Sequence, residues 1–124
     1  MHLDEYRDYC LSKAGAWEDL PFGPDTLVFK VGQKMFSAVG LESIPVQVSL
    51  KCDPERVPEL REAYEGIHTG PYMDKKHWNF VDLKSDVPAD LIRELVDHSY
   101  DLVVAGMTKA ERESLTKLTS HRKH

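Results

Sequence analysis

The densest mixture of charged, aromatic and hydrogen-bonding side chains in the sequence lies in residues 72–83. Its candidate binding residues, in chain order, are Tyr72, Lys75, Lys76, His77, Trp78 and Asn79. Ammonium groups neutralise phosphates, indole rings stack on flat ligands, and carboxamides hydrogen-bond to base edges. The segment therefore favours a binding site for an anionic or stacked ligand.

Three lysines in the preceding part of the chain could enlarge this site, namely Lys30, Lys34 and Lys51. With them, the segment would form a basic and aromatic surface that binds nucleic acid such as DNA. The chain has a net charge of -5, so such binding is expected to be weak and salt-sensitive. The alternative for Trp78 is a place in the core, with the lysine stems covering its edge.

A second hypothesis is a protein-interaction module, either chaperone-like or self-associating, without a nucleic-acid role. If Lys30 and Lys51 face solvent, we expect Val28 and Phe36 to share that face. An exposed apolar patch of this kind requires a cover. The cover would be a helix of the same chain or a partner.

Catalysis is a weaker interpretation of the same residues. Tyr72, Asp74, Lys75 and His77 could supply acid, base and anion-binding groups. The sequence has no P-loop, nucleophile elbow or dinucleotide-binding fingerprint, and its histidines lack metal-ligand spacing. We therefore predict a protein that is not an enzyme and that has no catalytic, cofactor or metal site.

Size and composition favour one small domain in the cytoplasm. The chain has 124 residues, of which 41% are hydrophobic and 30% charged, as in ordinary globular domains. No apolar run approaches the roughly 20 residues that a membrane-spanning helix needs, so no membrane association is expected. The N-terminus carries acidic residues where a signal peptide has basic ones. Cys10 and Cys52 lack a CxxC partner, which indicates buried thiols in a reducing compartment.

Hydrophobic periodicity predicts the elements that would position these residues. A helix is expected over 3–14 with Gly15 as its stop, and a second over 54–65 after Asp53 as N-cap. Pro58 either loosens the first turn of this second helix or moves its start to around Val57. Strands are expected over 27–31, 34–41, 46–52, 67–69 and 77–83, the first two joined by a turn at 32–33.

The C-terminal third is predicted to be helical. A long helix should begin after Asp86 as its cap, with Tyr100 at the edge of the core and its hydroxyl bonded to a loop. Thr108 and Glu111 fit a capping box for a last short helix. The order αβββαββα, with this C-terminal helix appended, predicts an α+β fold, an antiparallel sheet packed with helices.

Five segments in a fixed order resemble the MmcQ/YjbR family of small bacterial proteins. They are Pro21-Phe22-Gly23-Pro24-Asp25 with 28–31, Lys34-Met35-Phe36, Leu50-Lys51-Cys52-Asp53-Pro54, Lys75-Lys76-His77-Trp78-Asn79, and Ser99-Tyr100-Asp101-Leu102-Val103. The resemblance implies an α+β fold similar to secretion-chaperone-like and frataxin-like folds, and the family is commonly labelled DNA-binding. It predicts a domain over 1–106, followed by a short helix and basic tail over 107–124.

Overall fold

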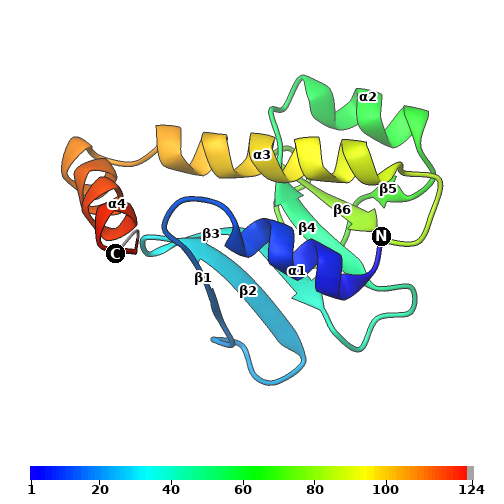
Figure 1. Cartoon of the computed structure of the whole chain (residues 1–124). Coiled ribbons are helices and arrows are strands. Elements are labelled where there is room, and N and C mark those ends of the chain that lie inside the picture. Colours follow the sequence, from blue (N-terminus) through cyan, green and yellow to red (C-terminus); the bar gives the residue numbers. More distant parts are fainter. Residues whose placement is uncertain (123–124) are drawn as a thin grey trace.

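The structure is a computed structural model that describes the backbone of residues 1–122 and the side chains of residues 1–115. Its elements are α1 (Leu3–Leu11), β1 (Ala16–Asp19), β2 (Thr26–Val31), β3 (Lys34–Gly40), β4 (Gln47–Lys51), α2 (Arg56–Ala63), β5 (Ile67–His68), β6 (Trp78–Asp82), α3 (Ala89–Ala105) and α4 (Lys109–Arg122). The α+β fold is confirmed, and the expected strands and helices are all present (Figure 1). One further strand, β1, is an addition to the predicted order.

The six strands form one antiparallel sheet in the order β1-β2-β3-β4-β6-β5. Val31 pairs with Lys34, which confirms the predicted two-residue turn at 32–33. Gly32 has a φ of 61° there, a conformation that glycine adopts without a steric cost. The tight turn fixes the register of the β2–β3 hairpin.

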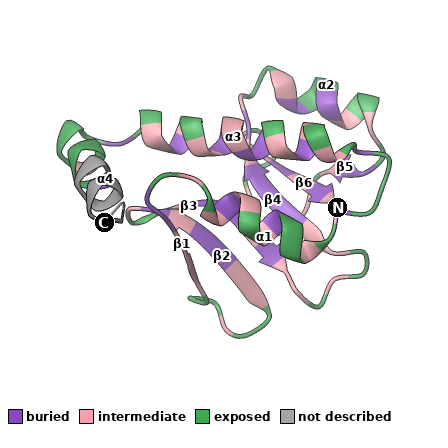
Figure 2. Ribbon diagram, in the orientation of Figure 1, coloured by how far each residue is buried: buried purple, intermediate pink, exposed green. Residues whose placement is uncertain are grey.

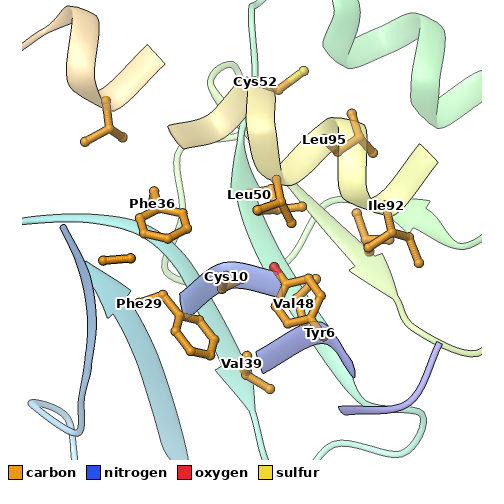
Figure 3. Close-up of a cluster of buried hydrophobic side chains, with 14 of the residues drawn as sticks. Tyr6, Cys10, Phe29, Phe36, Val39, Val48, Leu50, Cys52, Ile92 and Leu95 are labelled. Atoms are coloured by element: carbon orange, nitrogen blue, oxygen red, sulfur yellow. The ribbon is translucent and has the colours of Figure 1, made fainter. Parts of the chain in front are cut away.

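Helices α1 and α3 lie across one face of the sheet and enclose the core with it (Figure 1). The alternation along strand β4 explains why the core lies on this face. Val48 and Leu50 point toward the helices, while Gln47, Ser49 and Lys51 point away. Figure 2 shows buried positions along the sheet and on the sides of α1 and α3 that meet it. The aromatic centre of this core includes Tyr6, Phe29 and Phe36, gathered between strands and helices (Figure 3).

Polar side chains inside this core are hydrogen-bonded. The hydroxyl groups of Tyr6 and Ser37 are 2.6 Å apart, and Ser99 Oγ donates to the Phe36 carbonyl at 2.6 Å. Ser99 Oγ also accepts the backbone N–H of Lys51 at 2.9 Å, which links α3 to β4. Cys10 and Cys52 are both free and buried, as predicted. Burial raises the pKa of Cys10 to about 12.

The prediction for the first helix is wrong at its end. Helix α1 ends at Leu11, and Gly15 with φ 72° lies in the turn that leads into β1. The hydroxyl of Tyr100 donates to the Ala14 carbonyl in this turn at 2.5 Å, which confirms the loop contact expected for Tyr100.

Two predicted helix caps are also wrong. Pro88 is the N-cap of α3, and Asp86 instead accepts the backbone N–H groups of Glu65 and Gly66 at 2.9 and 2.8 Å. These bonds lower the pKa of Asp86. Helix α2 begins at Arg56, so Asp53 caps the preceding turn through the N–H of Glu55 at 2.9 Å.

The capping box at the start of α4 is confirmed. The Thr108 N–H donates to Glu111 Oε1 at 3.1 Å, and the Glu111 N–H donates to Thr108 Oγ1 at 3.2 Å. Met107 and Leu115 are buried in the core cluster, so α4 packs on the domain even though a boundary at 106 was predicted. The basic tail lies outside the described side chains, and residues 123–124 lie outside the described backbone. Among the helices that the structure describes, none has the length and apolar character needed to cross a bilayer.

Candidate functional site

The face of the sheet opposite α1 and α3 carries the candidate site. The register between β4 and β6 places Lys51 beside Trp78 and Ser49 beside Phe80 on this face. Ser49 also pairs with Ala38 of β3. No helix of the described part of the chain covers these residues (Figure 1). We call this surface the open face.

Trp78 is half-buried on the open face next to Lys51, so it is neither a core residue nor fully exposed. Trp17 lies on the same face at the other edge of the sheet, where Lys30 Nζ is 5.1 Å from the centre of its ring. The Trp17 indole N–H donates to the Gly32 carbonyl at 2.9 Å. Both tryptophans therefore present part of a ring on the open face while being held by the sheet.

The lysine-bearing turn before β6 is organised by Asp74. Its carboxylate accepts the backbone N–H of Lys76 at 2.9 Å and lies 2.5 Å from Nδ1 of His77. The bonds from His77 and Lys76 lower the pKa of Asp74. The Asp74 carbonyl accepts the N–H groups of His77 and Trp78 at 3.2 and 3.0 Å. The turn thus holds Lys75 and Lys76 at the exposed end of β6.

Arg61 of α2 fastens the same turn from the helix side. Its guanidinium donates to the carbonyls of Lys75 and Trp78 at 2.6 and 3.1 Å, and to Asn79 Oδ1 at 2.7 Å. Asn79 is only 3% exposed and is directed away from the open face, so the prediction that it contacts a ligand there is wrong. Its Nδ2 has no hydrogen-bond partner among the described residues. No pattern in the sequence indicated this role of Arg61.

The predicted lysines divide into two groups. Within the described residues, the ammonium groups of Lys51, Lys75 and Lys76 have no ion-pair or hydrogen-bond partner. Lys30 is on the open face but pairs with Asp19 at 3.1 Å. Lys34 is not brought to the site, because it pairs with Val31 on the helix side and donates to the Gly106 carbonyl at 3.3 Å. The structure therefore places Lys51 beside Trp78 across the β4–β6 pairing, and Lys75 and Lys76 in the turn that leads into Trp78.

A groove of about 640 Å³ lies on the open face next to these cations. Its apolar walls come from Phe22, Met35, Ala38, Pro71, Tyr72, Met73 and Phe80. Its polar groups come from Thr26, Ser43, Gln47 and Ser49. Of these residues, only Tyr72 was predicted from the sequence to be part of a site. The others come from strands and loops far apart in the chain, which no local pattern connects.

Two backbone features shape the rim of this groove. Tyr72 is fully exposed and has a φ of 68°, an unusual conformation for a bulky residue. Two residues earlier, a Cβ atom on Gly70 would lie 2.4 Å from Cε2 of Phe80. Glycine is therefore required at position 70 for the loop to lie against the Phe80 ring. Backbone outliers such as the positive φ of Tyr72 concentrate at functional sites.

His68 lies beside the groove, with its ring stacked on Phe80 at a centroid distance of 6.3 Å. Its Nε2 is 3.0 Å from Asp82 Oδ1 and its Nδ1 is 3.0 Å from the Thr69 carbonyl. Burial lowers the pKa of His68, but the bonds to Asp82 and Thr69 outweigh it and the net pKa is raised. Both ring nitrogens face acceptors, which favours the doubly protonated ring.

The described residues contain no group of three or more histidine, cysteine or acidic side chains arranged to hold a metal ion. The site is thus made of aromatic faces, unpaired ammonium groups and a mostly apolar groove. What it can do chemically is bind a flat or apolar ligand that carries negative charge at one end.

The fold and this surface define a class of two-layer α+β domain, in which the described helices cover one face of the sheet and leave the other open. The chain belongs to the YjbR family, whose model matches residues 11–102. It is 36% identical over 94 residues to the uncharacterized protein YbdF of Escherichia coli O157:H7, covering 75% of this chain and 76% of that protein. It is 31% identical over 119 residues to the uncharacterized protein YjbR of Escherichia coli K12, covering 95% of this chain and 100% of that one.

Solved structures agree with the fold. The crystal structure of Deinococcus radiodurans protein DR2400, which has the domain DUF419, matches with a TM-score of 0.85 and 42% identity, covering 92% of this chain and 87% of that one. A crystal structure of a Pseudomonas syringae protein matches with a TM-score of 0.72 and 28% identity, covering 82% of this chain and 98% of that one.

Proposed function

We propose that this chain is a nucleic-acid-binding protein, with DNA as ligand, that uses the open face of its sheet. The observation that carries the proposal is that the half-buried Trp78 lies beside Lys51 and directly after the turn of Lys75 and Lys76, and that all three ammonium groups are unpaired within the described residues. Lysines that have no acidic partner are free to neutralise phosphates, and an indole on the same face can stack on a base. Binding, rather than catalysis, is the proposed activity.

The rigidity of the turn supports this proposal. Asp74 and Arg61 together make seven hydrogen bonds or short polar contacts to residues 75–79, so the backbone that carries Lys75 and Lys76 is fixed before a ligand arrives. Preorganisation lowers the entropic cost of binding. The cytoplasm is the proposed location, because the two buried free thiols suit a reducing compartment.

The test is a titration of labelled DNA at several salt concentrations, followed by fluorescence anisotropy. Three phosphate contacts predict that the logarithm of the association constant falls with the logarithm of salt concentration with a slope of about -2 for a single strand. Replacing Lys75 and Lys76 together by glutamine should reduce the slope to about -0.7, because one contact remains.

The matched control replaces Lys84 and Lys109 by glutamine. Both lysines are exposed and unpaired within the described residues, and neither lies in the turn before β6. This control changes the net charge equally and should leave the slope unchanged. A wild-type protein without salt-dependent binding would refute the proposal, as would an equal loss in the two double variants.

A protein-interaction module is the second candidate, favoured by a different observation. Ile44 is almost fully exposed and Phe22 is largely exposed, on two loops that a hydrogen bond from Leu41 N to Asp25 O ties together at 2.9 Å. Exposed large apolar side chains that form a continuous patch mark protein contact sites, and the joined loops could form such a patch. Here the partner would be a protein segment or a second copy of the chain.

Light scattering after size-exclusion chromatography tests self-association through these loops. If a second copy is the partner, the molar mass should rise with concentration for the wild type and stay at that of a monomer after Phe22→Ser and Ile44→Ser replacement. A wild-type monomer at all concentrations would rule out the second copy as the partner.

A further inference from the structure

The chemistry of the groove on the open face differs from that of the lysine turn beside it. Within the described part of the chain, no charged side chain lines the groove. Aromatic and thioether side chains form its walls, including Phe80, Met35 and Met73. Its volume of about 640 Å³ lies in the range of small-molecule sites, which combine apolar walls with a few polar groups.

The polar groups of the groove are available to a ligand. Within the described residues, the carboxamide of Gln47 and the hydroxyls of Thr26 and Ser43 make no hydrogen bond to the protein. The Ser49 hydroxyl makes only a long contact of 3.5 Å to the Ala38 carbonyl. A ligand with apolar faces and a polar edge would satisfy both kinds of lining.

The groove and the cations are continuous along two strands. Phe80 and Trp78 are two residues apart on β6, and Ser49 and Lys51 are two residues apart on β4, so each pair points to the same face. Met73 of the groove lies two residues before Lys75. The unpaired ammonium groups therefore stand at one end of an uncharged groove.

We propose that the groove receives unpaired nucleobases and that the nucleic acid is consequently single-stranded. This inference rests on the proposed function, in which the lysines hold phosphates. The apolar faces of a nucleobase can stack on the rings of Phe80 and Tyr72. Its edge can form hydrogen bonds with the Gln47 carboxamide and the groove hydroxyls. Its phosphate, at the other end of the nucleotide, then reaches Lys51, Lys75 or Lys76.

Charge argues against a duplex in this groove. The outer surface of a duplex carries the phosphates, whereas its bases are stacked inside and paired. A duplex laid on the open face would bring phosphates against uncharged walls and leave the groove without bases. A single strand places phosphates and base faces on opposite sides, which matches the arrangement of cations and groove.

The experiment compares three labelled probes of equal length at low salt by fluorescence anisotropy. They are a single-stranded oligodeoxynucleotide, the same backbone with abasic sites, and the corresponding duplex. We expect the base-bearing single strand to bind about tenfold more tightly than the abasic strand, because stacking of even one base contributes that much. It should also bind more tightly than the duplex.

Two variants locate the effect. Tyr72→Ala removes a fully exposed ring and so leaves the fold intact, and Ala38→Leu fills the groove from the centre of the sheet. Both should weaken binding of the base-bearing strand about tenfold and leave binding of the abasic strand unchanged. Lys84→Gln serves as the control outside the groove.

The outcomes separate the two proposals. Equal, salt-dependent binding of the base-bearing and abasic strands, or tighter binding of the duplex, would overturn the nucleobase site while leaving nucleic-acid binding in place. Base-dependent binding that Tyr72→Ala and Ala38→Leu do not weaken would also overturn it. Absence of salt-dependent binding to any probe would overturn the proposed function, and this inference with it.

Discussion

Nε of Arg61 donates to Oδ1 of Asn79 at 2.7 Å, which joins helix α2 to a buried position of strand β6. The same guanidinium donates to the carbonyls of Lys75 and Trp78. Helix α2 therefore fixes the turn that carries two of the three unpaired cations, although it contributes nothing to the open face itself.

Replacing Arg61 by alanine should lower the free energy of unfolding by about 2 kcal/mol, because three hydrogen bonds are lost and buried Asn79 loses the partner of its carbonyl. Urea denaturation measures this change. Arg93→Ala is the control, since among the described side chains Arg93 pairs only with Asp90 and Glu5, both exposed, and it should change the free energy by less than about 0.5 kcal/mol. An equally small change for Arg61→Ala would contradict the role of the Arg61 guanidinium in holding the turn.

Gly70→Ala should destabilise the protein by about 1 to 3 kcal/mol, because the added methyl group would lie 2.4 Å from the ring of Phe80. Thermal and urea unfolding check the loss. Gly106→Ala is the matched control: its Cβ would come no closer than 3.5 Å to the Val103 carbonyl, and its φ of -81° suits alanine. A Gly70 variant as stable as the Gly106 variant would show that the loop does not press on Phe80.

Tyr72→Asn should raise the free energy of unfolding by about 0.5 to 1 kcal/mol, because asparagine tolerates a positive φ better than tyrosine does. The exposed ring makes no packing contribution that the substitution would remove. Leu20→Asn, also at an exposed position, should change the free energy by less than about 0.5 kcal/mol. Decreased stability of Tyr72→Asn would mean that the ring stabilises the native loop.

Stability should depend on pH through His68. Its pKa is raised above the ordinary value of 6.5, so the folded state binds a proton more tightly than the unfolded state. The contribution is complete below pH 6.5 and is lost as the pH rises through the raised value. Urea unfolding between about pH 5.5 and 8.5 should show this decline for the wild type and for His2→Gln.

In His68→Gln the decline should be absent, because glutamine does not titrate. His2 is a suitable control because it is exposed at the start of the chain. An unchanged pH profile in His68→Gln would assign the decline to other groups.

Local signals predicted most elements of this fold. The alternation of Val46 to Cys52 predicted β4, and the apolar stripe predicted α3, because both patterns depend only on which face is buried. The capping box of Thr108 and Glu111 is equally local. Strand β1 was missed because its four residues, Ala16–Asp19, include two acidic side chains and no clear alternation.

The composition of the open face was harder to predict. Val28 was correctly expected on the face of Lys30, since it pairs with Ala38 of the groove. Phe36 was wrongly expected there. The register shifts between Phe29, which pairs with Ser37, and Lys30, which pairs with Met35. This bulge turns Phe36 into the core and Met35 toward the groove.

The site itself could be predicted only in part. The run from Lys75 to Trp78 predicted a basic and aromatic surface, and the register of β4 and β6 adds Lys51 beside Trp78. Asn79 follows Trp78 on a strand, so it must point to the opposite face. Arg61 and the groove arise from contacts between distant segments, and no spacing in the sequence encodes them.

The alternation along β4 has a consequence for how this protein can change over evolution. Val48 and Leu50 belong to the core, while Gln47 and Ser49 line the groove. Because neighbouring positions serve different layers, a substitution at 47 or 49 alters what the groove accepts without repacking the interior. Members of one lineage could thus diversify their ligands position by position on an unchanged scaffold, and the same positions are the natural targets for engineering a new specificity.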